Sequence, residues 1–364
     1  MAKKEKVKFA SVGGQALIEG IMMRSPEKTV MAVRHSDGHV ILEDVPLKKR
    51  GKVFKFLSKI PIIRGVLGFP TSIALGYKAL MRSAEMSGLD DMEESEEPGK
   101  FEKWLNKVTG GNIMPLISTI SIILSLIICV AIFVLLPGFL AKQIGLLCFG
   151  SNNAHFDTYV TIIHAVLKIL IFIGYLALCS AQKDVRRTLM YHGAEHKTIH
   201  CLEAGKELTV ENVRSCSRYH PRCSTSFLFV MMVFSIAFFV LLQQILPFVN
   251  WQNLPLRYAI NIICIPIIMG VGYEIIKLLG RFNNWFTKIL AAPGLSMQYF
   301  TTKNPDDDQI EIAIASLCAA LGKEVPNFDR CKAPEKDTEA VPEDTAAPEA
   351  ADAPETASEG SENA

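Results

Sequence analysis

Four long apolar blocks are the feature of this sequence that most limits its fold. Each block reaches the roughly 20 residues that an α-helix needs to cross a bilayer, and 49% of the chain is hydrophobic. The blocks run over Met114–Leu136, Tyr159–Ala181, Ser226–Phe248 and Tyr258–Leu279. Every backbone group in hydrocarbon must be hydrogen-bonded within its own segment, so the blocks predict helices. We therefore expect an α-helical polytopic membrane protein with about four transmembrane helices.

Clusters of lysine and arginine predict the orientation of these helices. The clusters lie before the first block, between the second and third blocks, and at the end of the fourth, whereas the other two connections contain few cations. Cytoplasmic flanks are enriched in Lys and Arg, so an N-in, C-in arrangement places every cluster in the cytoplasm. The cations are distributed according to this topology. They do not form one basic surface with aromatic residues among them, which a nucleic-acid-binding protein would need. We therefore expect membrane lipids as partners and no nucleic acid.

The chain divides into four regions by composition. We expect a cytoplasmic N-terminal region at 1–112, a membrane domain at 113–281 that includes the cytoplasmic loop 182–224, a cytoplasmic segment at 282–325, and an acidic tail at 326–364. From Lys332 onward the tail carries ten acidic residues and two lysines, a net charge of −8. Such a segment cannot bury enough apolar surface to fold, so the tail is predicted to be disordered.

The N-terminal region predicts local structure at the membrane surface. Glycines in the stretch Gly13–Arg24 indicate tight turns or close backbone packing. Asp37-Gly38 lies between two β-prone runs and predicts a small β-hairpin. Residues 47–84 are basic and then apolar, with Arg64 inside the apolar part. This pattern favours helices lying in the interface, with an extra span or a re-entrant hairpin as alternatives.

The stretch from Tyr191 to Glu203 is the strongest candidate for chemistry. Read as a helix, it places five ionisable side chains within about 140° of arc. These side chains are His192, Glu195, His196, His200 and Glu203. His192, Glu195 and His196 form the pattern His-x-x-Glu-His, an inverted zincin motif whose glutamate is the general base. We expect His192 and His196 to bind a divalent metal, zinc in particular, with Glu195 as the catalytic residue.

The sequence leaves the remaining metal ligand open. His200 lies two turns beyond His192, where it would bind the same ion, orient a ligand or hold a second metal. Glu274 is an ionisable residue within a predicted span, which indicates function unless it pairs with a nearby cation. His220 and Cys223 belong to Cys216-x-x-x-His220-x-x-Cys223, a spacing that matches no standard zinc finger. Arg222 lies in the same segment and is a candidate for binding an anionic substrate.

Several segments together resemble the YqhQ-like bacterial membrane proteins, a family of unknown function described as candidate metal-dependent enzymes. The matching segments are Gly13–Arg24, Tyr191–His200, His220–Phe227, Tyr273–Ile276 and Pro293–Thr302. Ser25 and Ser224 depart from the pattern, which usually has glycine there. The resemblance implies metal dependence, a location in the bacterial cell membrane, and a site lined by Gln15, Glu19 and Arg24. It supplies no substrate.

These observations predict a metal-dependent hydrolase that acts at the cytoplasmic surface of the membrane. The alternative is a non-enzymatic membrane scaffold or transport-related protein with a structural zinc held by His and Cys. An open coordination position accessible to water would favour the enzyme, and a closed set of four ligands would favour the scaffold.

Overall fold

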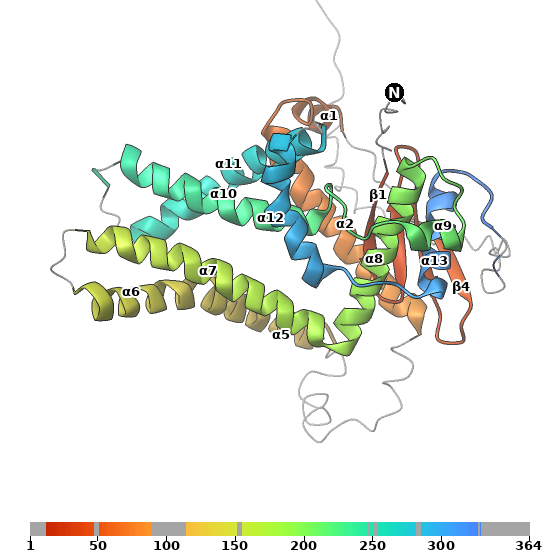
Figure 1. Ribbon diagram of the computed structural model, residues 1–364, viewed down its shortest axis with the longest axis horizontal. Helices are drawn as coiled ribbons and strands as arrows, with labels where there is room; N and C mark the ends of the chain where they lie inside the picture. Colours follow the sequence, from red (N-terminus) through yellow and green to blue (C-terminus); the bar gives the residue numbers. More distant parts are fainter. Residues whose placement is uncertain are drawn as a thin grey trace, which may run out of the picture. The chain divides into compact units, whose positions relative to one another are not determined.

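The protein is mostly helical with one small sheet, as the computed structural model shows for residues 12–46, 51–88, 114–150, 155–246, 248–249, 254–281, 285–326 and 328 (Figure 1). The strands are β1 (Gly13–Leu17), β2 (Gly20–Arg24), β3 (Thr29–Arg34) and β4 (Val40–Asp44). The helices are α1 (Lys52–Leu57), α2 (Ile63–Ser87), α5 (Met114–Val130), the π-helical η1 (Ala131–Leu135), α6 (Leu136–Phe149), α7 (Phe156–Ala181), α8 (Lys183–Glu203), α9 (Val210–Ser215), α10 (Ser224–Ile245), α11 (Leu254–Arg281), α12 (Trp285–Thr301) and α13 (Asp307–Ala320). The predicted tail lies outside the described residues from position 329 onward.

The four strands form one antiparallel sheet in the order β1-β2-β3-β4. The predicted hairpin is confirmed as β3 and β4, and Gly38 between them has a φ of 95°, which favours glycine. The stretch Gly13–Arg24, where glycines predicted tight turns or close backbone packing, forms a second hairpin with its turn between Leu17 and Gly20. Its cross-strand pairing with β3 and its burial outweigh the low strand propensity of glycine.

The sheet is covered on both faces, and the alternation of side chains along the strands explains why. On one face Ile21 and Met23 of β2 pack with Tyr191 and Ala194 of α8 and with residues of α13. On the other face Met22 packs with residues of α2, including Ala79 and Met86. Side chains at successive strand positions point to opposite faces, so a fully apolar strand such as β2 requires a layer on each side.

Three helices among the described residues are long and apolar enough to cross a membrane. They cover Thr119–Phe149, Thr158–Ala181 and Leu228–Ile245. The first is longer than its predicted block, because the helix continues through η1 and α6. The fourth predicted span lies on α11, where the apolar run is shorter, at Ala259–Ile275.

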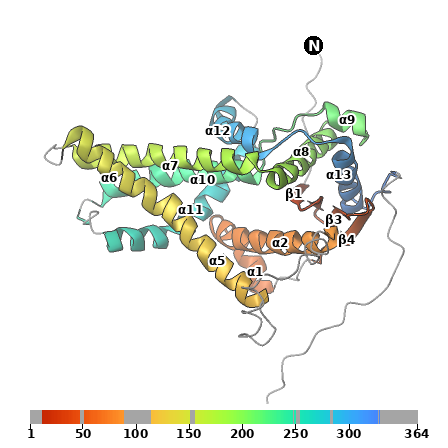
Figure 2. The ribbon, with the colours of Figure 1, turned by 90° about the horizontal axis from the view of Figure 1, so that it is seen from below.

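Helix α2 connects the sheet with α11. Near its start, Gly65 packs against Tyr273, and the Arg64 guanidinium forms an ion pair with Glu274. Near its end, the Ser83 hydroxyl accepts a hydrogen bond of 3.1 Å from the backbone N–H of Ile18. Figure 2 shows α2 between α11 and the strands. Residues Ile63–Ser87 thus form one helix whose two ends contact different parts of the fold.

Helix α8 continues directly from α7. Only Gln182 separates them, in an extended conformation that ends one helix and caps the next. The stretch Tyr191–Ile199 of α8 is buried throughout, although the helix is polar on average. Buried polar side chains need hydrogen-bonding partners. The partners of the histidines and the glutamate in this stretch therefore define the site.

Candidate metal centre

His192 and His196 lie on adjacent turns of α8 with their ring centroids 4.4 Å apart. The Nδ1 atom of His192 lies 2.8 Å from the backbone carbonyl oxygen of Thr301, and Nδ1 of His196 lies 2.5 Å from that of Arg218. A carbonyl oxygen can only accept, so each imidazole donates its Nδ1–H. A ring held in this way can bind a metal through Nε2, once that nitrogen has given up any proton it carries. Metal-binding histidines are oriented in this way, through their other ring nitrogen.

Cys223 supplies the third convergent donor. It caps the start of α10, and its Sγ lies 3.3 Å from Nε2 of His192. The ligand atoms of His192, His196 and Cys223 all lie within 4.8 Å of one another. Tetrahedral zinc bonds would separate such ligand atoms by about 3.3–3.6 Å. The residues present therefore fit a zinc ion with two imidazoles and one thiolate.

Charge at the centre suits a metal cation. Burial by itself would raise the pKa of the Cys223 thiol, but the imidazoles of His192 and His196 outweigh burial and hold that pKa well below its usual value. Burial likewise opposes protonation of His192, but the Cys223 thiolate prevails and raises the pKa of His192 to about 9. A buried thiolate beside two imidazoles is a strong ligand set, because the thiolate is the form that binds metal.

Glu195 lies beside these ligands, on the same buried stretch of α8. Burial raises the pKa of its carboxyl group, although the two imidazoles act in the opposite direction. The side chain packs closely on β1: a Cβ atom at Gly14 would lie 2.8 Å from Cγ of Glu195. The close packing predicted for the glycine-containing segment is therefore confirmed at Gly14. A carboxyl group with a raised pKa is suited to proton transfer near neutral pH.

The structure groups His200, Glu203 and His220 into a second cluster, with all their ligand atoms within 4.8 Å. In this cluster the polar atoms form an ion pair and hydrogen bonds with neighbouring residues. The Glu203 carboxylate pairs with the Arg222 guanidinium and lies 3.4 Å from Nε2 of His220. Nδ1 of His220 accepts a hydrogen bond of 3.3 Å from the backbone N–H of Arg222. Burial and the nearby His196 imidazole lower the pKa of His220 to about 4. This cluster is an ion pair with neutral histidines.

Among the described residues, the structure does not group the other predicted site residues with the three donors. Glu274 pairs with Arg64, and Cys216 lies beside Cys201 in a separate apolar cluster. The Gln15 side chain donates a hydrogen bond of 3.2 Å to the carbonyl of Gly76 in α2. The remaining two are Glu19, whose carboxylate binds Arg187 and the Tyr191 hydroxyl, and Arg24, which is exposed at the end of β2.

A third group of possible ligands, His35, Asp37 and His39, lies in the β3–β4 turn. Its side chains are partly or fully exposed, and the carboxylate of Asp37 is hydrogen-bonded to the ring of His39. Exposed acidic and imidazole groups in a turn are readily explained as solvated side chains. This group therefore gives no support for a buried metal centre.

Three residues that shape the centre carry no signal in the sequence. Thr301 and Arg218 act through backbone carbonyls, which no side-chain motif can reveal. Gln298 of α12 is fully buried and donates from Nε2 to the carbonyl of His220 and to the hydroxyl of Ser226, at 2.7 Å each. Its Oε1 accepts from the backbone N–H of His220. Gln298 thereby fixes the loop that carries Cys223.

Comparison with known proteins places the chain in a family. The profile of the family described as "Protein of unknown function (DUF1385)" matches residues 60–323. The chain is also 32% identical over 306 residues to the "Uncharacterized protein YqhQ" of Bacillus subtilis (strain 168), covering 84% of this chain and 90% of that protein. No solved structure matches the chain significantly. The chain therefore belongs to the YqhQ-like family of proteins of unknown function.

Proposed function

We propose that this protein is a zinc-dependent hydrolase anchored in the bacterial cell membrane by four helices, with both termini and the metal centre on the cytoplasmic side. One observation carries the proposal: His192, His196 and Cys223 converge while the Nδ1–H groups of both histidines are held by backbone carbonyls. Three protein ligands leave one position of a tetrahedral zinc for water or substrate, which is the arrangement of catalytic sites.

Glu195 is the residue that we assign to proton transfer. It lies within the His192–His196 motif, buried, with a raised pKa. A bound zinc would supply Lewis acidity toward a substrate oxygen and would lower the pKa of water to about 7. The Glu195 carboxylate would take a proton from the attacking water and return it to the leaving group. Gly14 leaves room for that carboxylate against β1.

The position of the centre beside the apolar helices favours a membrane-borne or membrane-proximal substrate. Helix α8 begins two residues after α7 ends, and Cys223 lies five residues before the apolar run that starts at Leu228. Five residues of helix rise only about 7.5 Å. A centre joined on both sides to candidate spanning helices would lie near the membrane surface, and the basic residues of the 182–224 loop favour the cytoplasmic side.

A structural zinc site is the second candidate, and burial is the observation that favours it. The exposed fraction is 9% for His192, 2% for His196 and 6% for Cys223. Structural sites are closed by four protein ligands, whereas catalytic sites keep one position open. The accessibility of the fourth position therefore distinguishes an enzyme from a scaffold.

Cobalt substitution of the purified full-length protein tests this difference. We expect Co²⁺ to give a sulfur-to-metal charge-transfer band that is lost in Cys223→Ser, with Cys216→Ser as the matched control. Added azide should then change the cobalt d–d spectrum, because it enters the open position. A cobalt spectrum that azide leaves unchanged would support the scaffold. The absence of a Cys223-dependent band would reject both functions.

A further inference from the structure

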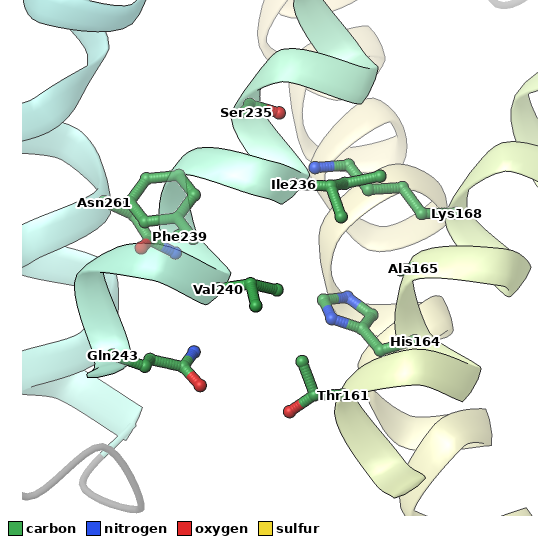
Figure 3. Close-up of a pocket in the computed structure, with 10 residues that line it drawn as sticks. All are labelled: Thr161, His164, Ala165, Lys168, Ser235, Ile236, Phe239, Val240, Gln243 and Asn261. Carbon is green, nitrogen blue, oxygen red and sulfur yellow. The ribbon is translucent and has the colours of Figure 1, made fainter. Parts of the chain in front are cut away.

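A cavity whose wall includes polar side chains lies among the apolar helices α7, α10 and α11 (Figure 3). Its volume is about 90 Å³, enough for a small polar group or a few water molecules. Ten residues line it: Thr161, His164, Ala165, Lys168, Ser235, Ile236, Phe239, Val240, Gln243 and Asn261. Six of these are polar, which is unusual for the interior of apolar helices.

Five of the six polar residues come from α7 and α10, and the sixth, Asn261, comes from α11. Thr161, His164 and Lys168 are spaced three and four residues apart, so they share one side of α7. Ser235 and Gln243 lie two turns apart on α10. Figure 3 shows His164 and Gln243 directed into the space between the helices. The cavity therefore has hydrogen-bonding groups on opposite walls.

Lys168 sets the charge of this cavity. It lies near the middle of the candidate span Thr158–Ala181, where an ammonium group is costly unless it has a counter-charge. The described lining residues include no carboxylate. The side-chain amides of Gln243 and Asn261 can donate hydrogen bonds to an anion, whereas the Ser235 hydroxyl donates to the carbonyl of Met232. Ile236 and Phe239 add an apolar wall beside them.

We propose that this cavity binds one oxyanion, a carboxylate or phosphate group, with Lys168 as its counter-charge. The anion has two possible sources, an anionic lipid whose chains lie along the apolar wall, or a small anion from solution. The site is separate from the metal centre, because Lys168 lies 13 residues before the end of α7. That distance is about 20 Å along the helix, before α8 begins.

Native mass spectrometry of the purified full-length protein tests the proposal. The protein would be transferred into phosphatidylcholine nanodiscs alone, with phosphatidylglycerol, or with oleate, and a further sample would receive inorganic phosphate. We expect one bound anion per protein. It should appear in the phosphatidylglycerol or oleate sample if the source is a lipid, and in the inorganic phosphate sample if the source is a small anion from solution. Lys168→Met should reduce retention by at least about tenfold, because the counter-charge is lost.

Two further variants make the result decisive. Lys168→Arg keeps the charge and should retain the anion. Lys142→Met removes a lysine from α6 that does not line the cavity, so it should behave as wild type. The metal content of all variants should be unchanged, which shows that they fold. The proposal is wrong if no arm gives a retained anion, or if Lys168→Met retains as much as wild type.

Discussion

Two clusters of similar composition use neighbouring turns of α8 together with the segment before α10, and their hydrogen bonds differ. In the first, His192 and His196 donate Nδ1–H to backbone carbonyls, which leaves Nε2 of each ring and Sγ of Cys223 to converge. In the second, His220 and Glu203 hydrogen-bond to each other and to Arg222. The difference shows that histidines with the same spacing along one helix can have different hydrogen-bond partners, and these partners are our reason for favouring the first cluster as the metal site.

The largest effect is expected from the histidines of the first cluster. His192→Ala or His196→Ala should remove bound zinc, with an affinity loss beyond the roughly 10- to 100-fold typical of changes to residues that only orient ligands. His200→Ala is the matched control on the same helix and should keep its metal. Elemental analysis of the purified proteins measures both. Equal metal loss in His200→Ala would mean that the two clusters form one site.

Replacement of the base should separate catalysis from binding. Glu195→Gln keeps the shape of the side chain but removes the proton acceptor, so zinc content should stay near wild type. Hydrolysis of any ester, amide or phosphoester substrate found for the wild type should fall by about 10²- to 10⁴-fold. If Glu195→Gln loses its metal, Glu195 is a ligand and the division of roles between the three residues is wrong.

The first cluster differs from the second in having a soft thiolate ligand, Cys223, in place of a carboxylate. Cys223→Ser should lower zinc affinity by at least about 10-fold, because a serine hydroxyl replaces a buried thiolate. The affinity is measured by competition with a chromophoric chelator. Cys216→Ser should have no effect, since Cys216 lies with Cys201. If zinc affinity fell less in Cys223→Ser than in Cys216→Ser, Cys216 and not Cys223 would be the ligand.

The second cluster should affect stability and not metal content. The side chain of Glu203 is 5% exposed and pairs with Arg222, so Arg222→Met leaves a buried carboxylate without its main cation. We expect a loss of about 3 kcal/mol in the free energy of unfolding, seen as a lower Tm. The double variant Glu203→Gln/Arg222→Met should recover part of that loss. Metal loss in folded Arg222→Met would contradict the structural role.

The smallest effect is expected at the glycine that packs on Glu195. A Cβ atom at Gly14 would lie 2.8 Å from Cγ of Glu195, whereas one at Gly13 would have nothing within 4 Å. Gly14→Ala should therefore cost about 1–3 kcal/mol of stability through overpacking. Gly13→Ala, in the same strand, is the matched control and should be close to wild type. Denaturation midpoints compare the two, and equal midpoints would show that Glu195 does not lie against β1.

Parts of this arrangement could be predicted from local sequence. The apolar blocks predicted spanning helices because hydrocarbon permits few other structures. The Asp37-Gly38 pair predicted the β3–β4 hairpin because the turn itself requires glycine. The motif at His192, Glu195 and His196 predicted three neighbours on one helix face because helical spacing is fixed. In each case the constraint acts over a few residues.

The remainder depends on contacts between distant segments. Cys223 lies 31 residues from His192, and the Thr301 carbonyl lies 109 residues from it. Neither partner is defined by its spacing, so the sequence alone left His200, His220, Cys223 and Glu274 as alternatives. The pairing of Glu274 with Arg64 spans 210 residues and could not be anticipated either. The sheet was underestimated because its glycines indicate turns, while the pairing of β1 and β2 depends on their burial by α8 and α2.

X-ray absorption spectroscopy at the zinc edge of the zinc-loaded protein tests the central claim most directly. We predict one sulfur at about 2.3 Å and two imidazole nitrogens at about 2.0–2.1 Å, with one further light atom from solvent. In Cys223→Ser the sulfur contribution should disappear. A wild-type spectrum with no sulfur, with two or more sulfurs, or with a sulfur that remains in Cys223→Ser would contradict a centre built from His192, His196 and Cys223.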